Sequence, residues 1–453
     1  MIEERLLDEV AGRVIMPGDA DYDSARTVMM GGIDRHPAVI VRVVDAADVA
    51  RVIAWARATG AELAVRSGGH SGAAHSTTEG GIVIDLRDLR TLEIDAGART
   101  ARAGTGLTAA EVSSAAAEHG LAIGFGDTGT VGIGGITLGG GVGYLSRRDG
   151  MTIDNLLGAE IVTADGRILE VDADHHPDLF WAIRGGGGNF GVATRFTYRL
   201  SALDGVVGGM LVLPATPETV AGWIAANEAA PDELSTIANV MPCPPMPMVP
   251  EEHHGSLVIF GMVAWSGQRE LGEAAIAPFR ALATPLADMV QPISYPEMFP
   301  PEDAEYHPTA VSTNLFMRLV DESVAGAMLE ALAASDAPMR AVQLRVQGGA
   351  IARVPADATA YAHRSSPIMV NIAAFYDGAD DRASKQAWVD ELSAALDQGE
   401  AGAYVNFVGD EGADRVRAAY PAATFARLAA VKSTYDPTNL FRLNQNVPPA
   451  AER

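Results

Sequence analysis

The segment Gly124–Gly143 reads GFGDTGTVGIGGITLGGGVG, and ten of its twenty residues are glycine. A flexible linker would mix glycine with serine and other polar residues. Here Val131, Ile133, Ile136 and Leu138 are interleaved with the glycines, which predicts an ordered and buried backbone. Glycine lets such a backbone approach a flat or anionic ligand closely. We therefore interpret the segment as part of a ligand site, with a glycine-rich structural turn as the alternative.

A second glycine-containing loop precedes this run and reads Arg66-Ser-Gly-Gly-His-Ser71. It follows a predicted strand over residues 63–65, and its two glycines let consecutive amides converge on an anion such as pyrophosphate. The side chains of Arg66 and Ser71 would add hydrogen-bond donors. His70 is then a glycine-flanked nucleophile beside a cofactor site, whereas a lone histidine is more often a structural residue.

Around these two segments, short β-branched runs alternate with alanine-rich amphipathic stretches, which is typical of α+β or α/β architecture. Asp45 is placed to cap a helix that Gly60 ends, and Thr108 and Glu111 form a capping box for another helix. Strands are predicted over residues 38–43, 63–65, 82–86, 99–103, 161–165, 167–171 and 192–200, and helices over residues 45–59, 108–120 and 178–184.

The pattern of predicted strands and helices changes after about residue 204. Longer strands are predicted over residues 209–213, 256–263, 313–318, 340–346 and 369–375, and helices over residues 269–282 and 382–396. This pattern favours a second domain with a mixed or antiparallel sheet flanked by helices. The proline-rich stretch Met241–Pro250 is interpreted as a surface loop or lid.

Charge and composition exclude several classes of function. With 33 basic and 58 acidic side chains the formal net charge is −25, which disfavours nucleic-acid and membrane partners. Lys385 and Lys432 are the only lysines and neither fits a pyridoxal enzyme or a P-loop. The single Cys243 rules out internal disulfides and iron–sulfur clusters. The pairs His175-His176 and His253-His254 lack metal-ligand spacing, so no metal site is expected.

The compartment expected from the sequence is the cytoplasm. One cysteine suits a reducing environment, and the start of the chain, residues 1–14, is acidic and amphipathic rather than signal-like. No apolar run reaches the ~18 residues of a membrane span.

A dinucleotide-binding fingerprint is the competing motif. Residues 104–109 read GTGLTA and fit G-x-G-x-x-A, and Asp127 follows about 20 residues later. The preceding strand carries Arg99 and Arg102, however, where a buried parallel strand should be uninterrupted and apolar. An NAD-dependent dehydrogenase is therefore the disfavoured alternative.

Four motifs together resemble a known family: RSGGHS at residues 66–71, TVGIGG leading to LGGGVG at 130–143, DLFWAIRGGGGNFGV at 178–192 and YDPTNLFRLNQN at 435–446. They are similar to the FAD-linked oxidases of the p-cresol methylhydroxylase (PCMH) and vanillyl-alcohol oxidase type, in the berberine-bridge-enzyme-like branch. The resemblance extends from about residue 36 to residue 448.

The resemblance implies an α+β fold with a PCMH-type FAD-binding domain over residues 1–203, rejoined by residues 426–453. Residues 204–425 would form the substrate domain, and residues 403–448 a berberine-bridge-like C-terminal segment. The resemblance also implies one covalent bond from His70 to FAD. The further cofactor-binding residues that it implies are Arg66, Ser67, Gly68, Gly69, Ser71, Asp127, Thr128, Thr130, Val131, Gly132, Gly134, Gly135, Gly140, Gly141, Gly143, Asn189, Gly191, Val192, Asn444 and Asn446.

Two departures from the family pattern matter for the chemistry. Relatives with a second flavin bond use a cysteine where this chain has Thr128, so only one bond is expected. The usual base is the second tyrosine of a Tyr-x-Asn-Tyr motif, but Phe407 occupies that position here, and phenylalanine cannot take a proton. The catalytic candidates are Tyr144, Tyr404 and Asn406. Strand alternation over residues 403–408 would place Tyr404 on the same face as Asn406 and opposite Phe407.

The expected activity is oxidation of a small organic donor by hydride transfer to flavin, with O₂ as the simplest acceptor. The missing base favours an amine donor over a secondary alcohol, because the lone pair of a neutral amine stabilises the developing cation directly. The alternative is an alcohol oxidised with help from another group, for which Tyr144 and Tyr404 are the nearest candidates in the sequence. A flavin-binding protein without turnover is the alternative from another class. The sequence identifies neither the donor nor the oligomeric state.

Overall fold

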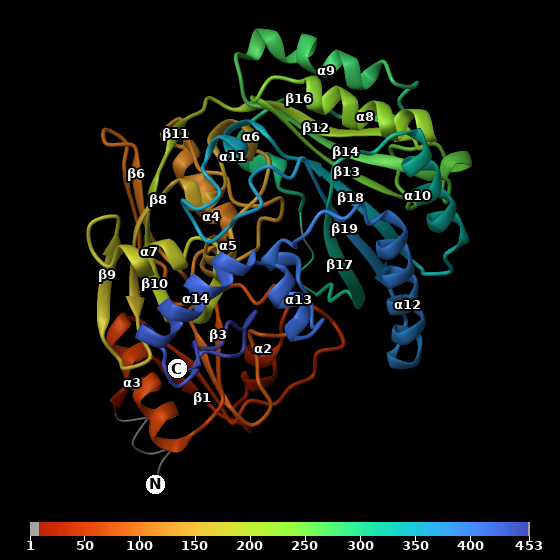
Figure 1. The fold of residues 1–453 in the computed structure, drawn as a ribbon. Helices are drawn as coiled ribbons and strands as arrows, with labels where there is room; N and C mark the ends of the chain where they lie inside the picture. The colour runs from red at the N-terminus through yellow and green to blue at the C-terminus, as the bar shows by residue number, and fades with distance from the viewer. Residues whose placement is uncertain (1–8, 302, 304, 452–453) are drawn as a thin grey trace.

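The computed structural model describes residues 9–301, 303 and 305–451. Most of the amphipathic N-terminal segment considered above, residues 1–8, therefore lies outside the described residues. Figure 1 shows the first 200 residues in the lower and left part of the molecule, and a large sheet with its helices at the upper right.

The first sheet, in the order β1-β2-β4-β3, is parallel except for β1. Helix α3 connects β2 to β3, begins where the Asp45 side chain accepts from the amide of Asp48, and ends at the left-handed Gly60, as the sequence predicts. Strands β2, β3 and β4 are short apolar runs, and nearly all of their residues are therefore buried. The elements are β1 (Arg13–Ile15), β2 (Val39–Arg42), α3 (Ala46–Thr59), β3 (Leu63–Arg66) and β4 (Ile82–Asp85).

The second sheet is antiparallel and has the order β5-β6-β10-β8-β9. Its β8–β9 hairpin is the one predicted around Gly166, which has a φ of 85°. The predicted capping box of Thr108 and Glu111 opens helix α4. The elements are β5 (Leu92–Asp95), β6 (Thr100–Gly104), α4 (Ala109–Ala117), β8 (Leu156–Val162), β9 (Ile168–Asp172) and β10 (Val192–Arg199), with a separate pair β7 (Leu121–Ala122) and β11 (Ser201–Ala202).

The third sheet is large and antiparallel, and its main order is β15-β12-β14-β13-β18-β19-β17 with β16 beside β12. Helices α8, α10 and α12 cover one face, where apolar side chains of strands and helices form one core cluster. The elements are β12 (Val206–Pro214), α8 (Pro217–Ala229), β13 (Leu234–Pro242), β14 (Leu257–Trp265), α9 (Gly272–Arg280), β15 (Ala287–Asp288), β16 (Gln291–Ile293), β17 (Ala310–Met317), α10 (Glu322–Ala334), β18 (Arg340–Val346), β19 (Ile368–Phe375) and α12 (Ala379–Leu396). The α+β class predicted from the sequence is confirmed.

The remaining elements are mostly short. They are the helices α2 (Tyr22–Arg26), α5 (Ile133–Gly139), α6 (Ser146–Asp149), α7 (Pro177–Ala182), α11 (Gly349–Arg353), α13 (Ala413–Ala418) and α14 (Ala422–Tyr435), and the 3₁₀ turns η1 (Thr152–Asp154), η2 (Gly187–Asn189), η3 (Glu251–His253), η4 (Arg269–Leu271), η5 (Tyr295–Met298) and η6 (Val405–Phe407). Helix α14 returns to pack beside α7, so the end of the chain rejoins its first part (Figure 1). Within the described residues, no helix combines the length and apolar character needed to cross a membrane.

One local prediction is wrong. Residues 403–408 form no strand and contain the 3₁₀ turn η6 (Val405–Phe407), because the amide of Tyr404 donates to the Asn314 side chain at 2.6 Å and not to a strand partner.

The proline-rich stretch Met241–Pro250 continues from the end of β13 as a surface loop, one of its two predicted forms, in which Pro245, Pro247 and Met248 are exposed. Its Cys243 and Val249 are buried in a small cluster on the large sheet.

Candidate active site

A cavity of about 410 Å³ lies where the two glycine-rich segments, η6 and the C-terminal tail meet. Many of the predicted site residues line it: Ser67, Gly68, Gly69, His70, Ser71, Asp127, Thr128, Val131, Gly132, Gly134, Gly135, Gly191, Val192, Tyr404, Asn406 and Asn444. Other predicted residues are not part of its lining: Arg66, Thr130, Gly140, Gly141, Gly143, Tyr144, Asn189 and Asn446. The structure therefore brings together motifs that are more than 300 residues apart in the sequence.

The loop that carries His70 lies directly against the glycine run. Ser67 Oγ donates to the carbonyl of Thr105 at 2.6 Å and accepts from the amide of Gly134 at 3.2 Å. His70 Nε2 lies 3.0 Å from Thr130 Oγ1, on the glycine run. Glycine is required where the backbones cross, because a Cβ at Gly68 would collide with the backbone of the run. These contacts fix the histidine ring at the wall of the cavity.

The glycines of the run serve two different purposes. Gly135 is in α5 and lines the cavity, and a Cβ added there would have no protein atom within 4 Å. Gly140 and Gly141 have φ of 142° and 80°, and a Cβ would lie 2.6 Å from Met151 Cε at Gly140 and would collide with Thr152 at Gly141. Protein packing and backbone conformation therefore explain these two glycines, which were predicted to contact the cofactor.

The open space at Gly135 yields a prediction. Gly135→Val should fold, since valine suits a helix interior no less than glycine, but its side chain would occupy cavity volume. We expect FAD content to fall at least about tenfold, the effect of a ~1.4 kcal/mol clash. Gly141→Ala is the matched control, which should lose stability instead because its φ is unfavourable. Flavin absorbance per chain measures FAD loading, and the melting temperature measures stability. Normal FAD loading by Gly135→Val would contradict the assignment of Gly135 to the cofactor site.

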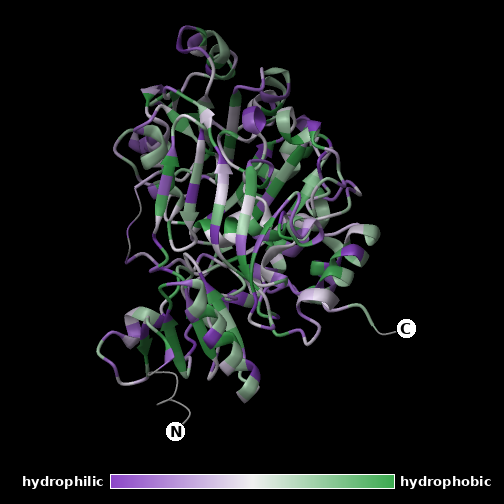
Figure 2. Ribbon diagram, turned by 90° about the vertical axis from the view of Figure 1, so that its left-hand side faces the viewer, coloured by the Kyte–Doolittle hydropathy of each residue, from purple (hydrophilic) through white to green (hydrophobic). Residues whose placement is uncertain are grey.

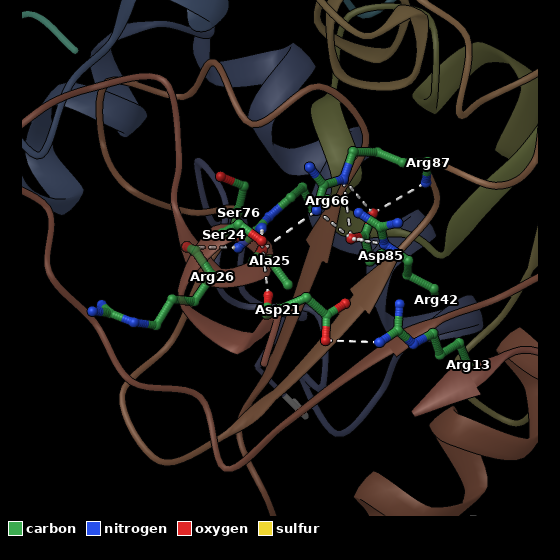
Figure 3. Close-up of polar contacts among 10 residues, drawn as sticks. All are labelled: Arg13, Asp21, Ser24, Ala25, Arg26, Arg42, Arg66, Ser76, Asp85 and Arg87. Atoms are coloured by element: carbon green, nitrogen blue, oxygen red, sulfur yellow. Dashed lines mark hydrogen bonds and ion pairs between the residues drawn. The ribbon is translucent and has the colours of Figure 1, made fainter. Parts of the chain in front are cut away.

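Arg66 does not act as the predicted anion donor. Val65 and Ser67 line the cavity, so the intervening side chain points to the opposite face of the strand. Arg66 is 1% exposed, and its guanidinium donates to three backbone carbonyls, those of Ala25, Arg26 and Ser76 (Figure 3). Burial lowers the pKa of Arg66 to about 10. Arg66 thus stabilises the start of the loop from the side of the strand that faces away from the cavity.

The C-terminal tail closes the cavity at another side. Asn444 lines it and donates through Nδ2 to the carbonyls of Gly188 and Phe441. Asn189, predicted to contact the adenine end, instead fastens the tail, since its Nδ2 donates to the Gln445 carbonyl and its Oδ1 accepts from the Val447 amide. Asn444 and Asn446 each keep a buried Oδ1 without a hydrogen-bond partner in the described part of the chain.

The segment that replaces the family's base motif packs tightly. Tyr404 Oη accepts from the amide of Gly141 at 2.8 Å and from Asn406 Nδ2 at 2.9 Å, and Asn406 Nδ2 also donates to the Ile136 carbonyl. Burial raises the pKa of Tyr404. Tyr144 is 2% exposed and belongs to the hydrophobic core, and burial raises its pKa well above 10. Only Tyr404 and Asn406 of the three catalytic candidates therefore reach the cavity.

Two residues near the cavity escaped the sequence analysis. Arg345 Nη2 donates to Asp127 Oδ2 at 2.7 Å, and its guanidinium lies 5.1 Å from the centre of the Phe407 ring. His75 lines the cavity, and burial lowers its pKa to about 4, so its ring is neutral near pH 7. Arg345 carried no signal because its partner Asp127 is 218 residues away. His75, by contrast, lies five residues after His70 and could have been considered as a further residue of the cofactor site.

The dinucleotide fingerprint at residues 104–109 does not form a Rossmann site. Its strand β6 lies between β5 and β10 in an antiparallel sheet, not in a parallel one. A Cβ at Gly104 or Gly106 would collide with the carbonyl of Leu89 or Leu86, so both glycines serve packing. No group of three or more metal-ligating side chains occurs among the described residues.

The cavity suits FAD. Nine of the residues that line it are glycines, so bare backbone forms much of its wall. At Gly135 and Gly188 a Cβ would meet no protein atom within 4 Å, which is the space that a flat ring or a ribityl chain requires. Ser71 and Thr128 supply hydroxyls, and Asn444 supplies a buried oxygen without a partner among the residues described. Such a site on an α+β fold defines a flavoprotein oxidoreductase.

Comparison with known proteins supports the assignment of the cavity to FAD. Residues 37–172 match the family model described as FAD binding domain, and residues 403–448 match the one described as berberine and berberine like. The chain is 31% identical to (R)-6-hydroxynicotine oxidase of Paenarthrobacter nicotinovorans, covering 97% of each chain. It is 32% identical to YvdP of Bacillus subtilis (strain 168), an uncharacterised FAD-linked oxidoreductase, covering 98% of this chain and 99% of the relative.

Solved structures show the same fold. That of 6-hydroxy-D-nicotine oxidase from Arthrobacter nicotinovorans superposes with a TM-score of 0.86 at 30% identity and covers 97% of this chain and 98% of that one. That of the berberine-bridge-like protein 1 of Physcomitrella patens superposes with a TM-score of 0.88 at 22% identity over both full lengths. The chain belongs to the FAD-linked oxidoreductases of the berberine-bridge-like branch and is an enzyme that uses FAD, as the sequence predicts.

Proposed function

We propose that this enzyme oxidises a small neutral amine with FAD bound covalently through His70, and that O₂ reoxidises the flavin. The observation that carries the proposal is the position of His70, which lines the cavity while the glycine run crosses its loop. The name of (R)-6-hydroxynicotine oxidase, a relative along nearly the whole chain, supports an organic nitrogen compound as donor. Thr128, in place of the family's cysteine, supports a single attachment point.

The proposal assigns cofactor binding and donor binding to different parts of the chain. We assign FAD binding to residues 1–203 with 426–453 and donor binding to residues 204–425, with residues 403–448 as the berberine-bridge-like segment. When bound, FAD supplies the acceptor for a hydride from a donor C–H bond. The chain holds the cofactor with the loop 66–71 and the run 124–143, and it excludes water with η6 and the tail. The single cysteine and the net charge of −25 support a cytoplasmic enzyme without nucleic-acid or membrane partners.

The polar groups around the cavity favour an amine over an alcohol. An alcohol must lose its hydroxyl proton, so it requires a base within hydrogen-bond reach. Phe407 cannot act as one, and the Tyr404 oxygen already accepts two hydrogen bonds while burial raises the pKa of its phenol. A neutral amine requires no such base. We therefore expect the rate of flavin reduction to rise with pH as the ammonium form of the donor loses its proton.

The test of this function is anaerobic bleaching of the flavin. The purified yellow enzyme is mixed without oxygen with (R)-6-hydroxynicotine, N-methylpyrrolidine, 1-phenylethanol and glucose in turn. Loss of the absorbance near 450 nm with an amine, and its return on admitting air, supports an amine oxidase. Bleaching by 1-phenylethanol or glucose alone would contradict the amine assignment. Bleaching by none of the four compounds would leave the amine assignment without support and contradict it for this panel.

Tyr404→Phe separates a positioning role from a base. The variant keeps the ring packing but loses the oxygen that accepts from Gly141 and Asn406. If Tyr404 only positions Asn406, flavin reduction by an amine donor should slow by less than about tenfold, whereas loss of a base typically costs 10²–10⁴. Stopped-flow reduction with FAD still bound is the measurement, and Tyr144→Phe is the matched control. A loss of a hundredfold or more in Tyr404→Phe alone would identify a tyrosine base.

A further inference from the structure

The carboxylate of Asp127 lies in the wall of the cavity, where the glycine run meets the large sheet. Its Oδ2 accepts from Arg345 Nη2 on β18 at 2.7 Å. Asp127 lines the cavity and its side chain is 26% exposed, so a molecule in the cavity can reach it. Its Oδ1 accepts no hydrogen bond from the residues that the structure describes, and it is not one of their sealed polar atoms. One carboxylate oxygen is therefore available to a ligand.

Arg345 reaches the glycine run because side chains alternate along β18. Val342 and Leu344 belong to the apolar core cluster under the helices of the large sheet, so Gln343 and Arg345 point to the opposite face. Figure 2 shows this alternation as bands of green with white and purple on the strands of the sheet. The polar side chains of β18 thus lie on the side of the sheet that meets the cavity wall.

The other contacts of Arg345 fix the position of the carboxylate. Its Nε and Nη2 donate to Gln343 Oε1 at 2.9 and 2.7 Å, and its Nη1 donates to the Val142 carbonyl at 3.1 Å. Gln343 is held in turn, because its Nε2 donates to Asn239 Oδ1 at 2.9 Å. The Arg345 side chain is only 5% exposed. The free oxygen of Asp127 is therefore positioned before a ligand binds, which lowers the entropy cost of binding.

The ion pair limits the charge of the ligand. Asp127 and Arg345 together are neutral, so an ammonium ion would bring an unpaired positive charge into the cavity, which is unfavourable. An anion or a carbonyl group would face the free carboxylate oxygen with no hydrogen to offer it. A neutral group with an N–H or O–H bond remains, and its hydrogen bond to a carboxylate is stronger than one between neutral groups.

The same pair separates an amine from an alcohol. A donor alcohol must lose its hydroxyl proton, and a carboxylate that took this proton would leave the buried Arg345 charge unpaired. Asp127 is therefore suited to hold a hydrogen that stays on the ligand, as the N–H of a neutral amine does. An apolar surface lies beside it, since the Phe407 ring lines the cavity and its centre is 5.1 Å from the Arg345 guanidinium.

We propose that Asp127 selects the donor by accepting, through Oδ1, a hydrogen bond from the N–H group of a neutral amine whose apolar part packs on Phe407. Asp127 is then a specificity-determining residue of the donor site, whereas the family resemblance assigns it to the cofactor. This inference rests on the proposed function, because it takes the N–H compound bound at Asp127 to be the donor oxidised in the cavity.

Pyrrole and furan test the inference without turnover. The two neutral aromatic rings have similar size, but only pyrrole can donate a hydrogen bond, and each is titrated into the FAD-loaded enzyme while the flavin absorbance is followed. The wild type should bind pyrrole at least about tenfold more tightly than furan, since a site built to bond an N–H group rejects the analogue that lacks it. In Asp127→Asn the two affinities should agree within about twofold, because the amide oxygen stays with Arg345 and the amide nitrogen faces the cavity. Asp410→Asn is the matched control and should keep the preference, since Asp410 is exposed and does not line the cavity.

Each outcome supports or overturns the inference. A preference that survives in Asp127→Asn, or that is absent in the wild type, overturns it. Where Asp127→Asn alone fails to hold FAD, Asp127→Asn with Arg345→Gln replaces it, because the second change removes the charge left unpaired. If this double variant also fails to hold FAD, Asp127 serves the cofactor, for example through a ribityl hydroxyl, and the inference is overturned.

The inference and the proposed function can fail separately. If no donor bleaches the flavin but the pyrrole preference depends on Asp127, only the proposed function fails. If an amine bleaches the flavin and the preference is unaffected by Asp127→Asn, only this inference fails.

Discussion

His70→Ala is expected to yield a chain whose intact mass is that of the polypeptide alone, whereas the wild-type mass should exceed it by one FAD. The reason is that the proposed attachment point, His70, lines the cavity on the loop that crosses the glycine run, and Thr128 offers no second attachment point. Mass spectrometry of the denatured protein and the colour of the acid precipitate measure the covalent bond. The variant should still bind flavin non-covalently, because the backbone walls of the cavity are unchanged.

The chain offers a matched control for this experiment. His75 lines the same cavity, and burial keeps its ring neutral by lowering its pKa to about 4. His75→Ala should therefore retain the added mass of FAD. Covalent flavin in His70→Ala, or its loss in His75→Ala alone, would move the attachment point to the other histidine.

Local rules predicted the parts of the fold that short-range interactions decide. Asp45 caps α3 and Thr108 opens α4, because each cap bonds an amide three residues away. The hairpin at Gly166 depends in the same way on its own turn. Strand β13 and helices α8 and α10 were missed, because α8 and α10 are rich in alanine with little polar contrast, and their packing on the large sheet decides their structure.

Site residues were placed correctly where a motif lies wholly in one loop. They were misplaced where packing against residues far away in the sequence decides which way a residue faces. Glycine at Gly135 and at Gly141 looks the same in the sequence, yet one faces open cavity and the other has φ of 80° against Thr152. Arg66 was misjudged because strand alternation turns its side chain away from the cavity. The pairing of Arg345 with Asp127 joins the large sheet to the glycine run, and no local pattern records it.

Lys432→Met is expected to have the largest effect on stability. Lys432 and Asp436 have completely buried side chains, and Lys432 Nζ lies 2.7 Å from Asp436 Oδ2. The ammonium also donates to the carbonyls of Asn189 and Phe441, so it ties α14 to the tail and to η2. Methionine fills the space but leaves the carboxylate unpaired, which typically costs about 3–5 kcal/mol. Urea unfolding at 25 °C measures the loss, and FAD loading should fall with it because Phe441 lines the cavity.

The only other lysine provides the comparison. Lys385 pairs with Asp336 and Asp381, whose side chains are 89% and 30% exposed, so water can solvate them once the ammonium is gone. Lys385→Met should therefore destabilise the protein much less than Lys432→Met. Adding Asp436→Asn to Lys432→Met should restore only part of the loss. A neutral amide needs no buried counter-charge and its Oδ1 can still accept from the amide of Leu440, but the amide of Phe441 loses the oxygen that now accepts from it. Equal unfolding midpoints for the single and double variants would show that the lost carbonyl contacts, and not the unpaired carboxylate, account for the effect.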